Sequence, residues 1–206
     1  NHGLAWAVKQ ANELGLPVLY YEGLTCTYKE ANDRLHTFVL QGVPETARRL
    51  GERGIGYCFY LRRRKSDAND VLYRLAEDAA CVVSDDYPTF IAAQHNRSVP
   101  DRLKVSYEVV DSSCIVPMNT WVKREYAAYT IRPKIRKVLA QNLEACPEPE
   151  VSQVWRGPAP RWHTPVCAAN IAELVASCEI DHRVKPSISY CGGRKAAERV
   201  LEHFLE

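Results

Sequence analysis

The residues of this chain that could do chemistry are few, and the clearest of them follow a predicted strand. Asp85 and Asp86 come directly after the apolar run Cys81-Val82-Val83 and stand just before a predicted helix. An Asp in that place is an ordinary helix N-cap. It can also contact a ligand, because open α/β sheets bind ligands outside the carboxyl ends of their strands. The sequence leaves both interpretations open.

Two groups of basic side chains could contact phosphate. One is the run Arg62-Arg63-Arg64-Lys65, and the other is the set Arg132, Lys134, Arg136 and Lys137 on a predicted helix. Neither has aromatic residues interleaved for base stacking, so a solvated surface is the simpler interpretation of both. The chain has 27 basic and 25 acidic side chains and a net charge of +2, which gives no general argument for a polyanionic partner.

Common catalytic motifs are missing from the 206 residues. There is no glycine-rich phosphate loop, and Gly54-Ile55-Gly56 precedes its strand, as a turn would. No Ser or Cys stands in a nucleophile elbow, and the six His residues fit no metalloprotease motif. The eight cysteines include no CxxC pair, and Cys58 and Cys81 lie in apolar runs, which favours reduced, buried thiols over disulfides or zinc.

Helices and strands are predicted to alternate over the first 110 residues. Helical spacing of apolar residues predicts helices over 4–14 and 31–50 and a further one that opens at Pro88. Between them, Ser66 and Asp67 should cap a helix that carries Val71, Leu72, Leu75 and Ala76. Short apolar runs predict strands at 17–21, 55–61, 81–83 and 105–110. Pro44 should kink or split the second helix. Because this alternation needs crossover connections, it predicts a doubly wound α/β fold with a mostly parallel sheet. Such sheets ordinarily begin with a strand, so we expect one upstream of Asn1.

The second part of the chain changes in character. A helix from about residue 131 to 143, with Pro133 in its first turn, is followed by five prolines between Cys146 and Pro165. Two short helices, 168–178 and 195–205, come next. We therefore predict an α/β domain over 1–145, a linker over 146–165 and the beginning of a helical domain over 166–206. No apolar run approaches the 18 residues or so that a membrane-spanning helix needs.

The most specific pattern lies between Val109 and Lys137. It begins Val-Val-Asp-Ser-Ser-Cys-Ile-Val-Pro and continues with Lys-Arg-Glu-Tyr-Ala-Ala-Tyr-Thr-Ile-Arg-Pro-Lys-Ile. This block resembles the class II DNA photolyases. The same resemblance extends over essentially the whole chain, through Asn1-His2-Gly3-Leu4-Ala5-Trp6-Ala7, Asp33-Arg34-Leu35-His36-Thr37-Phe38, Val82-Val83-Ser84-Asp85 and Gly192-Gly193.

The resemblance implies a light-driven DNA-repair enzyme that uses reduced FAD to split cyclobutane pyrimidine dimers. Members of that family have an N-terminal α/β antenna domain and a C-terminal helical domain, which holds FAD and takes the damaged dinucleotide out of the duplex. This chain would then be the N-terminal portion of an intracellular protein, cytoplasmic or nuclear, with its FAD site and its contact with damaged DNA in the helical domain. The alternative is a stand-alone photolyase-homology domain that acts as a non-catalytic binding or regulatory module.

The resemblance also implies an antenna pigment, a deazaflavin or a folate, at the strand ends. A planar pigment needs aromatic walls and a few fixed polar groups. The candidates at those ends and in the recognised block are Asp85, Tyr87, Tyr21, Lys123 and Glu125. For the last two the alternative is a solvated turn, because residues two apart do not share a helix face.

Overall fold

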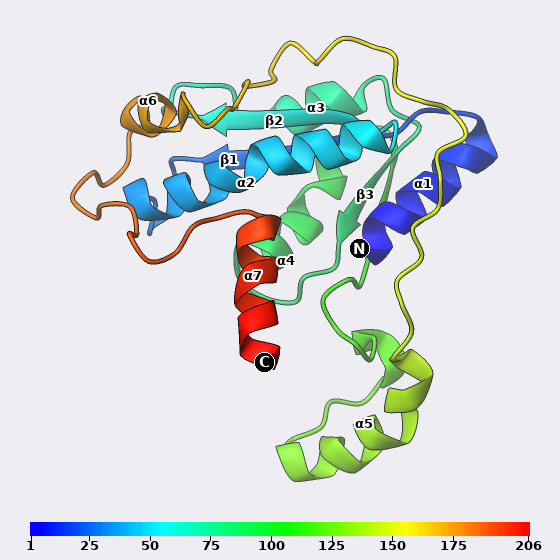
Figure 1. Cartoon of the computed structure of the whole chain (residues 1–206). Coiled ribbons are helices and arrows are strands. Elements are labelled where there is room, and N and C mark those ends of the chain that lie inside the picture. The colour runs from blue at the N-terminus through cyan, green and yellow to red at the C-terminus, as the bar shows by residue number, and fades with distance from the viewer. The chain divides into compact units, whose positions relative to one another are not determined.

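The computed structural model describes residues 1–206 and divides them into two compact units (Figure 1). The first unit contains Asn1–Leu14 and Leu72–Glu150, and the second contains Gly15–Val71 and Val151–Glu206. One boundary between the units, after Glu150, falls inside the predicted linker. None of the helices is both long and apolar enough to cross a membrane.

The first unit is built on two parallel strands. Strand β3 (Cys81–Asp85) pairs with β4 (Ser106–Val110) along its whole length. Helix α1 (His2–Leu14) packs on both strands, and the indole N–H of Trp6 donates to the Glu108 carboxylate. The other helices of this unit are α3 (Val71–Ala76), which begins at the unit boundary, α4 (Phe90–Ser98) and α5 (Ala128–Asn142), with single 3₁₀ turns at Pro100–Arg102 and Met118–Thr120.

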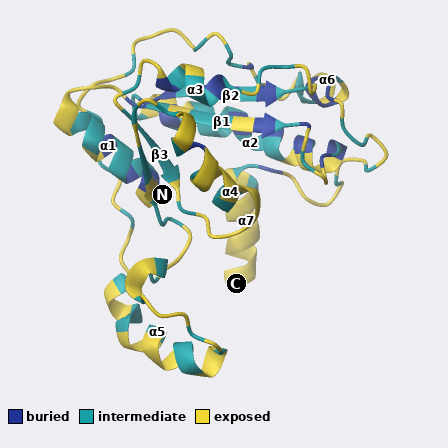
Figure 2. Ribbon diagram, turned by 180° about the vertical axis from the view of Figure 1, so that it is seen from behind, coloured by how far each residue is buried: buried dark blue, intermediate teal, exposed yellow.

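The second unit also has two parallel strands. Strand β1 (Leu19–Thr25) pairs with β2 (Gly56–Arg62), and the long helix α2 (Asp33–Glu52) connects the two strands. Helices α6 (Ile171–Ala176) and α7 (Arg194–Leu205) follow later in the chain. A cluster of buried side chains lies between β2, α2 and α6; Leu40 and Phe59 in it are wholly inaccessible to solvent. Figure 2 shows this buried material along β1, β2, α2 and α6, and shows α7 as exposed.

The parallel α/β class predicted from the sequence is confirmed, since both strand pairs are parallel and a helix connects the strands of each pair. The four strands form two separate two-stranded sheets, one in each unit. Each predicted helix and strand has a counterpart whose ends differ by a few residues from the expected ones.

Prolines lie inside two of the helices. Helix α2 is not split at Pro44 but continues from Asp33 to Glu52. Leu40 and Val43 before the proline and Leu50 after it are all buried, so packing on both sides compensates for the hydrogen bond that Pro44 cannot make. Pro133 lies inside α5 and not in its first turn, because that helix already begins at Ala128.

The proline-containing segment after Glu150 has no helix or strand but is anchored on β2. The N–H of Trp155 donates to the Gly54 carbonyl at 2.8 Å, and the N–H of Thr164 donates to the Phe59 carbonyl at 2.7 Å. The hydroxyl of Thr164 accepts from the N–H of Leu61 at 3.2 Å. Trp155 also packs over Gly56, where a Cβ atom would lie 2.5 Å from the indole ring. The segment therefore replaces a neighbouring strand at this edge of β2.

Limited digestion with a glutamate-specific protease should therefore cut first at Glu144, Glu148 or Glu150, apart from trimming at the C-terminus. These residues lie in irregular backbone before the anchored stretch begins. Mass spectrometry of the first fragments measures the cleavage site. A first cut between residues 55 and 110 would contradict the predicted linker.

Substitution of Gly56 by Ala should lower the free energy of unfolding by about 1–3 kcal/mol, because the added methyl group would clash with the Trp155 indole. In a Trp155→Ala background the same substitution should cost clearly less, since the ring is gone. Denaturant unfolding of the two single variants and the double variant measures this coupling. Additive effects would mean that Trp155 does not pack on Gly56.

Candidate functional site

The carboxyl ends of β3 and β4 are covered by the beginning of α1. Asp85, the last residue of β3, accepts hydrogen bonds from the Asn1 side-chain amide at 3.2 and 3.3 Å. The N–H of Gly3 donates to the Ser112 hydroxyl at 2.9 Å. A Cβ atom on Gly3 would lie only 2.9 Å from an oxygen of Asp85, so the Asp85 carboxylate would have to move to admit a larger residue there. The Asp85 carboxylate thus lies at the N-terminus of α1.

Backbone hydrogen bonds order the loops that surround Asp85. The N–H of Asp86 donates to the Val110 carbonyl at 2.8 Å, and the carboxylate of Asp111 accepts from three backbone N–H groups between Ser113 and Met118. Tyr87 lies beside Asp85, with its N–H donating to the Asp85 carbonyl, and its side chain is 46% exposed. Asp85 and Tyr87 therefore form one polar and aromatic edge. Neither Asp85 nor Asp86 is the N-cap of α4, because the residue at that position is Thr89.

Lys123 and Glu125 form a separate group near the start of α5. Glu125 makes an ion pair with Lys134, and this ammonium group, with the Thr130 side chain, holds the pKa of the carboxyl below its ordinary value. Lys123 lies close enough to Glu125 to contribute to the same effect and is itself exposed. The interactions of Glu125 are thus made with its own segment and with α5, and none joins it to Asp85 or Tyr87.

Tyr21, the fifth predicted residue, belongs to the second unit. It lies in the middle of β1, opposite Cys58 in β2. Burial raises the pKa of its hydroxyl to about 12, and the neighbouring Cys58 and Tyr60 add to this effect. Tyr21 is thus a neutral, half-buried strand residue and does not lie at the strand end where it was expected.

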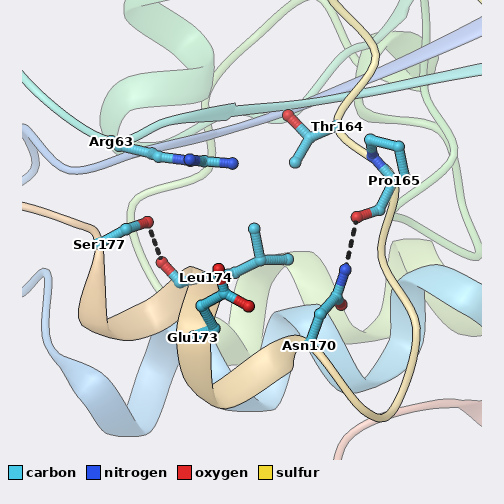
Figure 3. Close-up of a pocket in the computed structure, with 7 residues that line it drawn as sticks. All are labelled: Arg63, Thr164, Pro165, Asn170, Glu173, Leu174 and Ser177. Atoms are coloured by element: carbon cyan, nitrogen blue, oxygen red, sulfur yellow. Dashed lines mark hydrogen bonds between the residues drawn. The ribbon is translucent and has the colours of Figure 1, made fainter.

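The sequence missed a cavity at the carboxyl end of β2, because two of its walls come from distant segments. Arg63 follows β2 directly and reaches into a space of about 280 Å³, as Figure 3 shows. The rest of the lining comes from the irregular segment and from the region of α6: Thr164, Pro165, Asn170, Glu173, Leu174 and Ser177. The position of Arg63 after a strand was the one signal for this cavity, and the basic run was interpreted as solvated surface.

A larger hollow of about 920 Å³ lies between α2, α6 and the segment that precedes α7. At one end, His182 contacts the Asp33 carboxylate through Nδ1 at 2.7 Å and the Cys178 carbonyl through Nε2 at 3.0 Å. The ammonium group of Lys185 lies 3.7 Å from the Asp33 carboxylate. The remaining walls of the hollow are largely apolar. No pattern in the sequence indicated that Asp33, His182 and Lys185 would lie together. None of the five predicted residues lines either hollow.

The fully buried His36 on α2 is a core residue and not a catalytic one. Its ring stacks on Tyr28, with ring centroids 5.8 Å apart, and its Nε2 has no hydrogen-bond partner. Burial lowers the pKa of the imidazole, which keeps it neutral. Among the contacts described here, no nucleophile is paired with a base.

Comparison with known proteins assigns the chain to a family. The DNA photolyase family matches residues 1–150. A deoxyribodipyrimidine photo-lyase of Methanothermobacter thermautotrophicus is 34% identical over 144 residues, which is 69% of this chain and 32% of that protein. The crystal structure of an archaeal photolyase from Sulfolobus tokodaii, described with two FAD molecules, matches 98% of this chain and 42% of its own, with a TM-score of 0.59 and 13% identity. That structural match shows the fold.

The chain thus spans about a third of the related enzyme and less than half of the archaeal structure. The matched residues include α1, β3 and β4 with Asp85 at the strand end, together with the block between Val109 and Lys137. This chain belongs to the DNA photolyase family.

Proposed function

We propose that this chain is the N-terminal portion of a class II, FAD-dependent photolyase that repairs cyclobutane pyrimidine dimers in DNA with light. The match of the family to residues 1–150 carries the proposal, and the block between Val109 and Lys137 favours class II. We assign the α/β domain to 1–145, the linker to 146–165 and the beginning of the FAD-binding helical domain to 166–206. The protein would act inside the cell, in the cytoplasm or nucleus, on DNA that its helical domain binds.

Within that protein, the α/β portion would position an antenna pigment, a deazaflavin or a folate. An antenna passes on excitation energy and breaks no bond, which agrees with the lack of a paired nucleophile and base near Asp85. The S. tokodaii photolyase is described as implying a novel light-harvesting cofactor, which supports a pigment in this part of the family.

The groups proposed to contact the pigment are the four predicted residues that lie in the first unit. Asp85 would supply a fixed carboxylate and Tyr87 an exposed ring at the end of β3. Lys123 and Glu125 would supply a charged pair. Tyr21 lies in β1 of the second unit and is not assigned to this crevice. FAD, by contrast, would be held by residues of the helical domain, and none of the residues described here is assigned to it.

The natural protein that carries this chain should purify with bound flavin and should lose the dimers of an irradiated oligothymidine only in the light. Flavin absorption and chromatography of the repaired oligonucleotide measure the two properties. A folded, colourless protein without light-dependent repair would contradict the enzyme and favour the alternative, a non-catalytic binding or regulatory module.

The antenna site is tested on this chain by titration with a deazaflavin and, separately, with a reduced folate, followed by fluorescence. Binding in the micromolar range should weaken about tenfold or more in Asp85→Ala, which corresponds to a loss of about 1.4 kcal/mol. Asp85→Asn keeps an acceptor for Asn1 and separates the charge of Asp85 from its anchoring of α1.

Asp78→Ala, which removes an exposed carboxylate in the same unit, is the matched control and should bind normally. Circular dichroism verifies that each variant is folded. Unchanged binding in Asp85→Ala, or no binding by the folded chain, would remove the pigment from this crevice.

A further inference from the structure

The positive charge of this chain is concentrated in one stretch. Residues 121–142, which comprise α5 and the segment before it, contain six basic side chains and a single acidic one, Glu125, although the whole chain has a net charge of only +2. The six are Lys123, Arg124, Arg132, Lys134, Arg136 and Lys137. The rest of the chain is therefore net acidic, and the excess of positive charge is a local property of this segment.

These basic groups are available to a partner. All six side chains are exposed, and Glu125 makes its ion pair with Lys134. Arg124, Arg132, Arg136 and Lys137 form no ion pair. Exposed guanidinium groups without an ion-pair partner attract phosphate, to which they can donate two parallel hydrogen bonds.

Two exposed tyrosines lie next to the free guanidinium groups. Tyr126 is 79% exposed and Tyr129 is 67% exposed, and their rings meet edge to face with centroids 5.7 Å apart. Because α5 begins at Ala128, Tyr129, Arg132 and Arg136 stand at helical spacing on one face. No aromatic residue stands between the basic residues of this helix, but the observed start of the helix brings Tyr129 onto the same face.

The opposite face of α5 does not compete for a partner. Its apolar side chains, among them Ile131, Ile135 and Val138, are partly buried and not exposed. A helix that inserts into a lipid surface needs an exposed apolar face beside its basic one. The exposed face of α5 combines basic groups and aromatic rings, which is the combination that binds a single nucleic-acid strand.

We propose that Tyr126, Tyr129, Arg132, Arg136 and Lys137, here called the α5 surface, bind a single-stranded segment of DNA. The guanidinium and ammonium groups contact phosphates, and the tyrosine rings stack on unpaired bases. This inference goes beyond the proposed function, since it involves neither FAD, nor light, nor the antenna crevice.

The test is fluorescence anisotropy of the whole chain with a labelled oligothymidine of about 15 nucleotides at low salt. Arg132→Glu combined with Arg136→Glu should weaken binding by at least about tenfold and reduce its dependence on salt, because fewer counterions are released. The matched control is Arg64→Glu combined with Lys65→Glu, which makes the same change of charge at exposed positions of the second unit and should leave binding nearly unchanged.

The tyrosines are tested separately from the charges. Tyr126→Ala combined with Tyr129→Ala should weaken binding to the single strand about five- to tenfold, while the corresponding pair of Phe substitutions should retain it, because stacking needs the ring and not the hydroxyl. A duplex of the same length should bind more weakly than the single strand, since its bases are not available for stacking.

Several results would overturn the proposal. They are absence of binding by the folded chain, an equal loss in the control pair, equal binding to duplex with no effect of the Ala substitutions, or preferential binding to anionic phospholipid vesicles. None of these outcomes bears on the photolyase assignment, because that is tested by flavin content and light-dependent repair. Failure of those assays would in turn say nothing against DNA binding by the α5 surface.

Discussion

The second unit depends on the hydrogen bonds that satisfy the outer edge of β2. Phe59 is buried and central in the core, yet its N–H donates to the ring of His163 at 3.1 Å and its carbonyl accepts from the N–H of Thr164. An unpaired buried N–H or C=O group would cost about 1–3 kcal/mol. Burial lowers the pKa of His163, so its ring stays neutral and its Nδ1 can accept the hydrogen bond from the N–H of Phe59.

This arrangement explains why a proline-containing segment can stand where a strand would otherwise lie. Prolines cannot donate to a ladder, so the segment contacts β2 at a few points through His163, Thr164 and Trp155. Once it is in place, it brings Thr164 and Pro165 opposite Arg63 and forms a wall of the cavity at the end of β2. The cavity is thus a consequence of how one strand edge is covered.

In the first unit, a comparable constraint operates at the start of α1. Asn1, Gly3 and Ser112 connect the helix to the carboxyl ends of β3 and β4, and the Asp85 carboxylate lies in the same group of contacts. The residue that best fits a ligand-binding role therefore also contributes to the fold. A single substitution of Asp85 changes both properties, and only a variant that keeps its acceptor oxygen can separate them.

Periodicity and the spacing of prolines were sufficient to predict the elements and the parallel α/β class, because both are local properties of the chain. Strands 55–61 and 105–110 and the irregular stretch after Cys146 could be identified in this way. The block between Val109 and Lys137 was also sufficient to recognise the family, which the match over residues 1–150 then established.

Which side chains meet was decided only by the tertiary structure. Asp33 and His182 are 149 positions apart in the sequence. Arg63 lines one cavity with Thr164 and Ser177 only because the chain returns to β2 and α2 about 100 residues later. Tyr129 joins Arg132 and Arg136 on one face because α5 begins earlier than proline chemistry suggested. Contacts between distant segments depend on packing and on the pairing of buried backbone groups, and neither leaves a periodic signal in the sequence.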